Sequence, residues 1–153
     1  MGIEIIPGVL LICTFVLLLT KGPGEGGVYT GAAYEGAAVL PWLGQKLSFL
    51  LKPLFGLTSA ECIAVPITAL GAAGAAIGLV PGLLTSGLAG PQDIAVFTAM
   101  CMCWSGYLST HVSMMDLLGE TRFTGKAILS HTLGGIVAGM SAHWFYTFFY
   151  LLQ

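Results

Sequence analysis

The sequence contains very few charged side chains. Its 153 residues include five Lys or Arg and seven Asp or Glu, which make up 8% of the chain and give a formal net charge of -2. Soluble globular domains carry roughly 25% charged residues, so this composition argues against a soluble fold. The shortage of Lys and Arg also excludes the basic surface that binding to nucleic acid requires.

Sequence signatures of enzymes are absent as well. The chain holds no nucleophile motif, no pair of catalytic carboxylates, no phosphate-binding loop and no haem-attachment sequence. Its four cysteines, Cys13, Cys62, Cys101 and Cys103, lie in or beside apolar runs, where cysteine behaves as a small hydrophobic residue. Cys101 and Cys103 would point to opposite sides of a helix, so with His111 they make a poor metal site. We expect no disulfide framework, no enzymatic activity, no cofactor and no bound metal.

Apolar sequence is what the chain has in abundance, since 56% of its residues are hydrophobic. A membrane span needs about 20 mostly apolar residues, and four segments qualify: 3–20, 62–84, 94–118 and 127–152. They should be helices, because backbone in lipid must satisfy its own hydrogen bonds. Glu4 stands where a signal peptide would be basic, so we interpret the first segment as a retained span. We predict an all-α polytopic membrane protein with one membrane domain over residues 1–153.

Two different segments connect the first and second spans. Residues 21–38 form a Gly-rich loop, which we expect to be the most mobile part of the chain. Residues 41–56 are amphipathic, with Pro53 ending the pattern, and predict an interfacial helix or a re-entrant arm. The leucines at helical spacing in this second segment are Leu43, Leu47, Leu50, Leu51 and Leu54.

Basic residues predict the orientation. They lie in the first connection (Lys21, Lys46 and Lys52) and in the third (Arg122 and Lys126). With four crossings these two connections share a side, so the positive-inside rule places them in the cytoplasm and both termini outside.

The second span is rich in glycine and proline. Pro66 and Pro81 bracket Gly71, Gly74 and Gly78, so this helix is easily interrupted. Interrupted helices let transporters present backbone groups to a substrate near the bilayer midplane. The same small residues also permit close helix packing in lipid. Both uses remain open.

The third span carries a polar cluster, which is expensive at membrane depth and therefore informative. On a regular helix Ser105, Ser109 and Asp116 share one face, while Trp104, Tyr107, His111 and Met114 or Met115 share another. One face could line a polar cavity and the other could hold an aromatic substrate. In the alternative reading, the hydroxyls bond carbonyls of the preceding turn and the aromatic side chains pack in the bundle.

Two further histidines lie in the last span. His131 follows the Arg122–Lys126 connection and is either a proton-relay group or an interfacial side chain. His143 precedes the aromatic sequence WFYTFFY, which suits an interfacial belt or a docking surface for another chain.

Three sequence elements resemble a known family. They are LKPLFGLTSAE before a span, SGLAGPQDIAVF after the Gly/Ala-rich span, and the polar segment WSGYLSTHVSMMD. Together they resemble the nucleoside-recognition, or Gate, domain membrane proteins, within which the small YjiG-like and SpmB-like branch is most similar. The resemblance implies a half-sized unit that pairs with a homologous, separately encoded membrane protein, either as a transporter or, as in sporulation proteins, as an assembly subunit. The Gly-rich insert at 21–38 departs from the small members, and the acidic and asparagine ligands of a sodium-coupled nucleoside site are missing.

The leading hypothesis is a subunit of a two-component transporter in the bacterial cytoplasmic (inner) membrane that carries a small polar organic solute. The alternative is a non-transporting assembly or maturation subunit of a membrane complex. A metal or redox protein built on Cys101, Cys103 and His111 is a third hypothesis, without support from spacing. Proton coupling is assigned to His111, Asp116 and His131. The predicted substrate-binding residues are Thr68, Gly71, Gly74, Gly78, Pro81, Trp104, Ser105, Tyr107, Ser109, Thr110 and His111.

Overall fold

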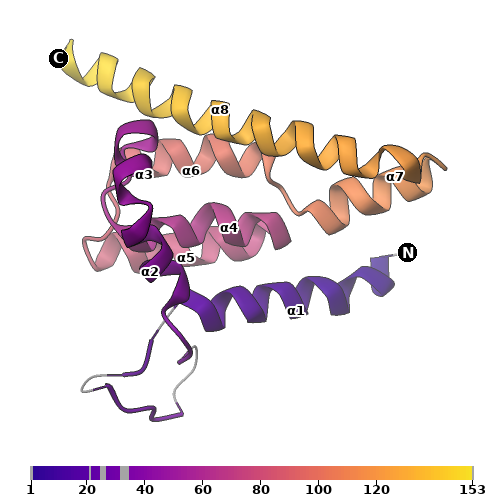
Figure 1. Cartoon of the computed structure of the whole chain (residues 1–153), viewed down its shortest axis with the longest axis horizontal. Coiled ribbons are helices and arrows are strands. Elements are labelled where there is room, and N and C mark those ends of the chain that lie inside the picture. Colours follow the sequence, from indigo (N-terminus) through magenta and orange to yellow (C-terminus); the bar gives the residue numbers. More distant parts are fainter. Residues whose placement is uncertain (1, 21, 25–26, 32–34, 153) are drawn as a thin grey trace.

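The computed structural model of the chain describes residues 2–20, 22–24, 27–31 and 35–152 (Figure 1). These residues form helices joined by short connections, and none of them lies in a β-strand. The predicted all-α class is therefore confirmed. The longest helices run along the long axis of the molecule, and the N- and C-termini lie at its opposite ends.

The N-terminal third begins with one long helix, α1 (Gly2–Thr20), and continues into two short ones. The amphipathic segment forms α2 (Val39–Lys46) and α3 (Ser48–Phe55). The prediction that Pro53 ends the helical pattern is wrong, because Pro53 lies inside α3. The helix ends at Gly56, whose φ of 61° is the left-handed conformation that closes many helices.

The Gly-rich loop has hydrogen bonds of its own in the part that the structure describes. The Glu35 carboxylate accepts bonds of 2.7 Å from the N–H groups of Thr30 and Gly31 and from the Thr30 hydroxyl. Residues 21, 25–26 and 32–34 of this loop lie outside the described residues. High mobility of this loop stays a prediction.

The second predicted span folds into a helical hairpin. A 3-10 helix, η2 (Ala60–Ile63), leads into α4 (Ala64–Gly71), and α5 (Ala73–Thr85) follows after Ala72, whose backbone is extended (φ -159°, ψ 121°). The Cys62 thiol donates to the Leu88 carbonyl at 3.3 Å, so the chain returns to the end at which it entered. In Figure 1, α4 and α5 lie beside each other. We call residues 60–85 the hairpin and residues 69–73 its tip.

The interruption falls at the tip and not at a proline. Pro66 lies in the first turn of α4, where a missing N–H removes little of the helical hydrogen bonding. Pro81 lies inside α5, whose helix continues to Thr85. The segment 62–84 is thus interrupted, which is one of the two uses that its glycines and prolines left open, and its two halves fold back on each other instead of continuing in one direction.

The third predicted span is also divided. Helix α6 (Pro91–Cys103) stops, and the chain resumes as a π-helix, η3 (Leu108–Val112), followed by α7 (Ser113–Leu117). The prediction of a regular helix over 94–118 is wrong, because Gly106 adopts a left-handed φ of 68° that continues no helix. We call residues 104–107 the break.

A 3-10 turn, η4 (Thr121–Phe123), leads into the last helix, α8 (Thr124–Leu151), which runs along α6 and η3 (Figure 1). Gly135 and Gly139 permit the close approach of α8 to α6. A Cβ atom on Gly139 would lie 2.6 Å from Cγ of Met100, and one on Gly135 would overlap the Trp104 indole. Small residues of this kind let helix backbones pack closely.

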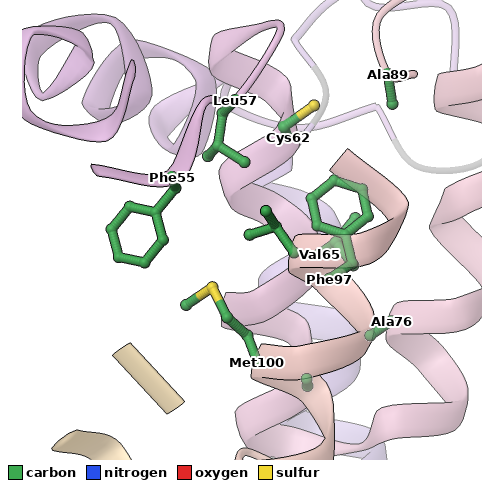
Figure 2. Packing of buried hydrophobic residues seen from close by; sticks show 10 residues of the cluster. Phe55, Leu57, Cys62, Val65, Ala76, Ala89, Phe97 and Met100 are labelled. Atoms are coloured by element: carbon green, nitrogen blue, oxygen red, sulfur yellow. The ribbon is translucent and has the colours of Figure 1, made fainter. Parts of the chain in front are cut away.

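The apolar core lies where the hairpin meets α3, α6 and α8. Figure 2 shows Val65 of α4 beside Phe97 of α6, with Met100 and Phe55 nearby. Val65 and Phe97 are almost inaccessible, with exposed fractions of 1% and 3%. These apolar contacts hold the hairpin against its neighbouring helices.

A buried carboxylate holds the outer end of the hairpin, which we call its base. Asp93 is fully buried near the start of α6 and accepts hydrogen bonds from the Thr58 N–H (2.9 Å), the Thr58 hydroxyl (2.5 Å) and the Gly90 N–H (2.8 Å). Beside it, the Gln92 amide donates to the Gly56 carbonyl at 2.8 Å and lies 3.0 Å from Nδ1 of His143 in α8. These bonds join the segment that precedes the hairpin to the start of α6.

By length and composition, no single helix of the described residues qualifies as a membrane span. One pair does so jointly, α3 with the helix from Ala60 to Gly71, and its two members meet at a bend of 77°.

Candidate functional site

The two interruptions of regular helix meet at one place. The Gly106 N–H, in the break, donates to the Ala69 carbonyl at the hairpin tip over 2.8 Å and also lies 2.9 Å from the Trp104 carbonyl. A helix end leaves backbone N–H and C=O groups without intrahelical partners. The contact therefore brings backbone groups from two helix ends together inside the molecule, where they bond each other.

Polar side chains join the break to α8. The Trp104 indole N–H donates to the Thr132 carbonyl at 3.2 Å, and the Tyr107 and Thr132 hydroxyls lie 2.9 Å apart. The Thr132 hydroxyl also donates to the Ile128 carbonyl at 2.7 Å. Because a hydroxyl has one proton, Tyr107 must be the donor of the bond between the two hydroxyls. The aromatic rings are thus held by the last helix.

Two histidines meet on the other side of the break. Nε2 of His111, in η3, is hydrogen bonded to Nδ1 of His131, in α8, and the ring centroids lie 4.3 Å apart at an angle of 84°. The Tyr107 ring contacts His111 edge-on at 4.8 Å. His111 is buried, with an exposed fraction of 5%, whereas His131 is exposed. The pair therefore joins a buried ring to an accessible one.

Thr110 connects this pair to the backbone of the break. Its hydroxyl lies 2.8 Å from the Gly106 carbonyl, 3.0 Å from the Ser105 carbonyl and 2.9 Å from Nδ1 of His111. Carbonyl oxygens can only accept, so the threonine proton points to them and its oxygen accepts from the imidazole. These partners assign the proton of neutral His111 to Nδ1 and leave its Nε2 as the acceptor for His131.

A groove of about 560 Å³ leads along the hairpin and α6 to the break. Most of its lining is apolar, and Ser105 is the one residue of the break that contributes to it. The lining residues are Val65, Ala73, Ile77, Val80, Ile94, Phe97, Thr98, Cys101, Met102 and Ser105. An apolar groove with few polar side chains suits an apolar ligand or the apolar face of a helix.

Most of the predicted substrate-binding residues of the third span lie around the break. Trp104, Ser105, Tyr107, Thr110 and His111 occupy the break and η3. The Ser109 side chain lies outside what the structure describes. Asp116 is exposed in α7, so only His111 and His131 of the three predicted proton-coupling residues are brought together.

The predicted hairpin residues are more scattered. Gly71 is buried beside the tip, whereas Gly74, Gly78 and Pro81 are exposed along α5. Thr68 is fully buried and donates to the Ala64 carbonyl at 2.7 Å, so its hydroxyl is used within its own helix. In the third span, the Thr110 hydroxyl bonds the Gly106 carbonyl four residues earlier, as the alternative reading of that span expected.

Sequence reasoning missed two residues that organise this region. Thr132 is hydrogen bonded to both aromatic side chains of the break. Nothing in the sequence around it, one position after His131, marks it for this role. Asp93 had a readable signal, because Gly90, Pro91 and Asp93 match the N-cap, first and third positions that favour these residues at a helix start.

Among the described residues, no group of three or more His, Cys, Asp or Glu side chains is placed to hold a metal ion. Comparisons of the chain with family models, curated proteins and solved structures find no match. Backbone groups, hydroxyls and two imidazole rings thus lie together around the break, and these are groups that can exchange hydrogen bonds with a polar molecule and, for imidazole, bind a proton.

Proposed function

We propose that the chain is a membrane-embedded subunit of a two-component transporter for a small polar organic solute, in the bacterial cytoplasmic membrane. Exposed apolar side chains support the location. Leu10, Leu11 and Phe15 of α1 and Leu129 and Leu133 of α8 each expose more than half of their surface. At 1.5 Å per residue, α8 is about 42 Å long, so its length, taken without its composition, reaches across a hydrocarbon core of about 30 Å.

The observation that carries the proposal is the meeting of the hairpin tip with the break. Irregular backbone is tolerated at membrane depth where it is buried in protein or lines a polar cavity. In transporters, such discontinuous helices form the site for substrate and coupling ion. Here the hydrogen bond from Gly106 to Ala69 joins two of them, and Trp104 and Tyr107 offer aromatic faces for a planar solute.

The partner in this proposal is a homologous Gate-domain membrane protein. It would cover the groove and the adjoining face of α5, where Gly74, Gly78 and Gly82 have open space around the position of a Cβ atom. Small residues at this spacing let a neighbouring helix approach closely. A substrate pathway generally forms between two repeats, so the groove of a single copy would supply one half of the pathway.

A second candidate is the non-transporting assembly or maturation subunit. The feature that favours it is the C-terminal part of α8, where Trp144, Phe145, Phe148 and Phe149 each expose more than half of their surface. A shallow groove of about 650 Å³ lies along this face. A large exposed aromatic face is typical of a docking surface for another protein.

Purification of the tagged chain from its native host, with mass spectrometry of what co-purifies, tests the proposal. The complex is then heated with a panel of nucleosides, amino acids, sugars and carboxylic acids. We expect a homologous membrane partner and a rise in melting temperature with one class of solute. A homo-oligomer indifferent to every solute would favour the assembly role.

A matched pair of variants connects this test to the break. Gly106 and Gly119 have nearly the same backbone conformation (φ 68° and 69°), so Ala costs each about 1 kcal/mol of backbone strain. Gly119 is exposed in the turn after α7. We expect Gly106→Ala to abolish stabilisation by the solute while the partner still co-purifies, and Gly119→Ala to leave both unchanged. Equal solute responses in the two variants would remove the break from the binding site.

The hairpin also changes the proposed topology. Four crossings would place both termini outside, but a returning hairpin leaves three crossings, by α1, by α6 to α7, and by α8. We therefore expect the two termini on opposite faces of the membrane. Epitope tags at the two ends and after Gly119 are probed with antibody before and after spheroplasts are permeabilised. The N-terminal and Gly119 tags should share one side; two terminal tags on the same side would restore four crossings.

A further inference from the structure

We propose that His111 and His131 form a site that binds one proton, and that the proton is the ion coupled to transport. The inference rests on the proposed function and assigns its coupling ion. It is carried by the geometry of a continuous hydrogen-bonded chain from an accessible ring on α8 to backbone carbonyls in the break.

When both rings are neutral, all hydrogen bonds of this hydrogen-bonded chain point in one direction. Nδ1–H of His131 donates to Nε2 of His111, Nδ1–H of His111 donates to the Thr110 hydroxyl, and that hydroxyl donates to the carbonyl of Gly106 or Ser105. This arrangement leaves Nε2 of the exposed His131 as the basic nitrogen of the pair. A proton from solution is therefore expected to bind there first.

Uptake of that proton can move positive charge into the molecule. The new N–H bond forms at Nε2 of His131, and the proton on Nδ1 of the same ring passes to Nε2 of His111. His131 is then neutral again, and the buried His111 carries the charge beside Thr110 and the break. Release reverses each bond. A second proton would place two imidazolium rings in contact, so repulsion limits the pair to one.

The groups around the pair leave this charge without a carboxylate partner in the described part of the chain. From η3 and the break, His111 faces Thr110 and the edge of Tyr107, and α8 contributes His131. Asp116 of α7 is exposed. The ionisable residues of α1, which also packs on η3, are Glu4 and Cys13, whose side chains lie outside the described residues. A solute with an acceptor or anionic group at the break would stabilise the proton on His111, which is the linkage that coupling requires.

Histidine NMR tests the site without a transported solute. The purified chain in detergent, labelled with ¹⁵N-histidine, is titrated between about pH 5 and pH 8, the range in which imidazole changes charge. The variant His143→Gln removes the remaining histidine and serves as the background. We expect His111 and His131 to titrate together and to bind one proton between them. In His111→Gln and in His131→Gln the remaining ring of the pair should lose its coupled response, because its hydrogen-bond partner is gone, and in His131→Gln the buried His111 also loses its route to solvent.

Two independently titrating rings, each unaffected by substitution of the other, would overturn the inference. So would a stoichiometric metal ion found by elemental analysis of the same sample. Failure of the transporter proposal gives a different result. If the histidine pair binds one proton but no solute stabilises the protein, the proton site stands and its role in transport does not. Conversely, if an imposed pH gradient changes solute uptake in neither the wild type nor His131→Gln, the protein is a transporter but the proton is not its coupling ion.

Discussion

Replacing Asp93 by alanine is expected to destabilise the chain by about 3 kcal/mol. The carboxylate accepts three hydrogen bonds, two from Thr58 and one from Gly90, and the substitution leaves all three donors without their acceptor. A buried polar group that loses its partner costs about 1 to 3 kcal/mol, less where water can reach it, as at the exposed Thr58. The negative carboxylate also interacts favourably with the partial positive charge at the N-terminus of α6, and this interaction is lost as well.

The measurement is the midpoint of unfolding by a denaturing detergent, followed by tryptophan fluorescence. Asp116→Ala is the matched control, since Asp116 is an exposed carboxylate and its loss should change stability by less than about 0.5 kcal/mol. If the two variants unfold at the same detergent concentration, the Asp93 carboxylate does not hold the base of the hairpin.

Alanine at two adjacent glycines of α8 should change the free energy of unfolding in opposite directions. A Cβ atom on Gly135 would overlap the Trp104 indole, so Gly135→Ala must move a side chain that is also bonded to the Thr132 carbonyl. Overpacking of this kind costs about 1 to 3 kcal/mol. Gly134 has open space around it, so Gly134→Ala should stabilise the chain by up to about 1 kcal/mol through helix propensity alone.

Both variants gain the same helix propensity, so their difference isolates the clash with Trp104. The readouts are the unfolding midpoint and the emission of Trp104, observed in a background in which Trp42 and Trp144 are phenylalanine. We expect Gly135→Ala to shift the emission and Gly134→Ala to leave it unchanged. Equal stabilisation by both substitutions would contradict the close packing of α8 on the break.

The all-helical class and the extent of α8 could be predicted from sequence, because long apolar runs leave few alternatives. The hairpin could not. The segment 62–84 is long enough to cross a membrane and has no charge or polar turn at Ala72 to mark a reversal. Its return depends on contacts far apart in sequence, such as Cys62 with Leu88 and Thr58 with Asp93.

The candidate site was predictable in its members but not in its arrangement. The density of polar residues from Ser105 to His111 pointed to the segment in which the break and η3 lie. The break itself comes from Gly106, whose left-handed backbone no periodicity reveals. His111 and His131 are 20 residues apart, and only the turn between α7 and α8 brings their rings together.

The hairpin is held by different kinds of contact along its length. Hydrogen bonds of Asp93 and Gln92 fix its base, apolar packing of Val65 on Phe97 holds its first helix, and the hydrogen bond from Gly106 to the Ala69 carbonyl joins its tip to the break. Because Ala69 is itself fully buried in this core, a displacement of the break must shift packed side chains as well as one hydrogen bond.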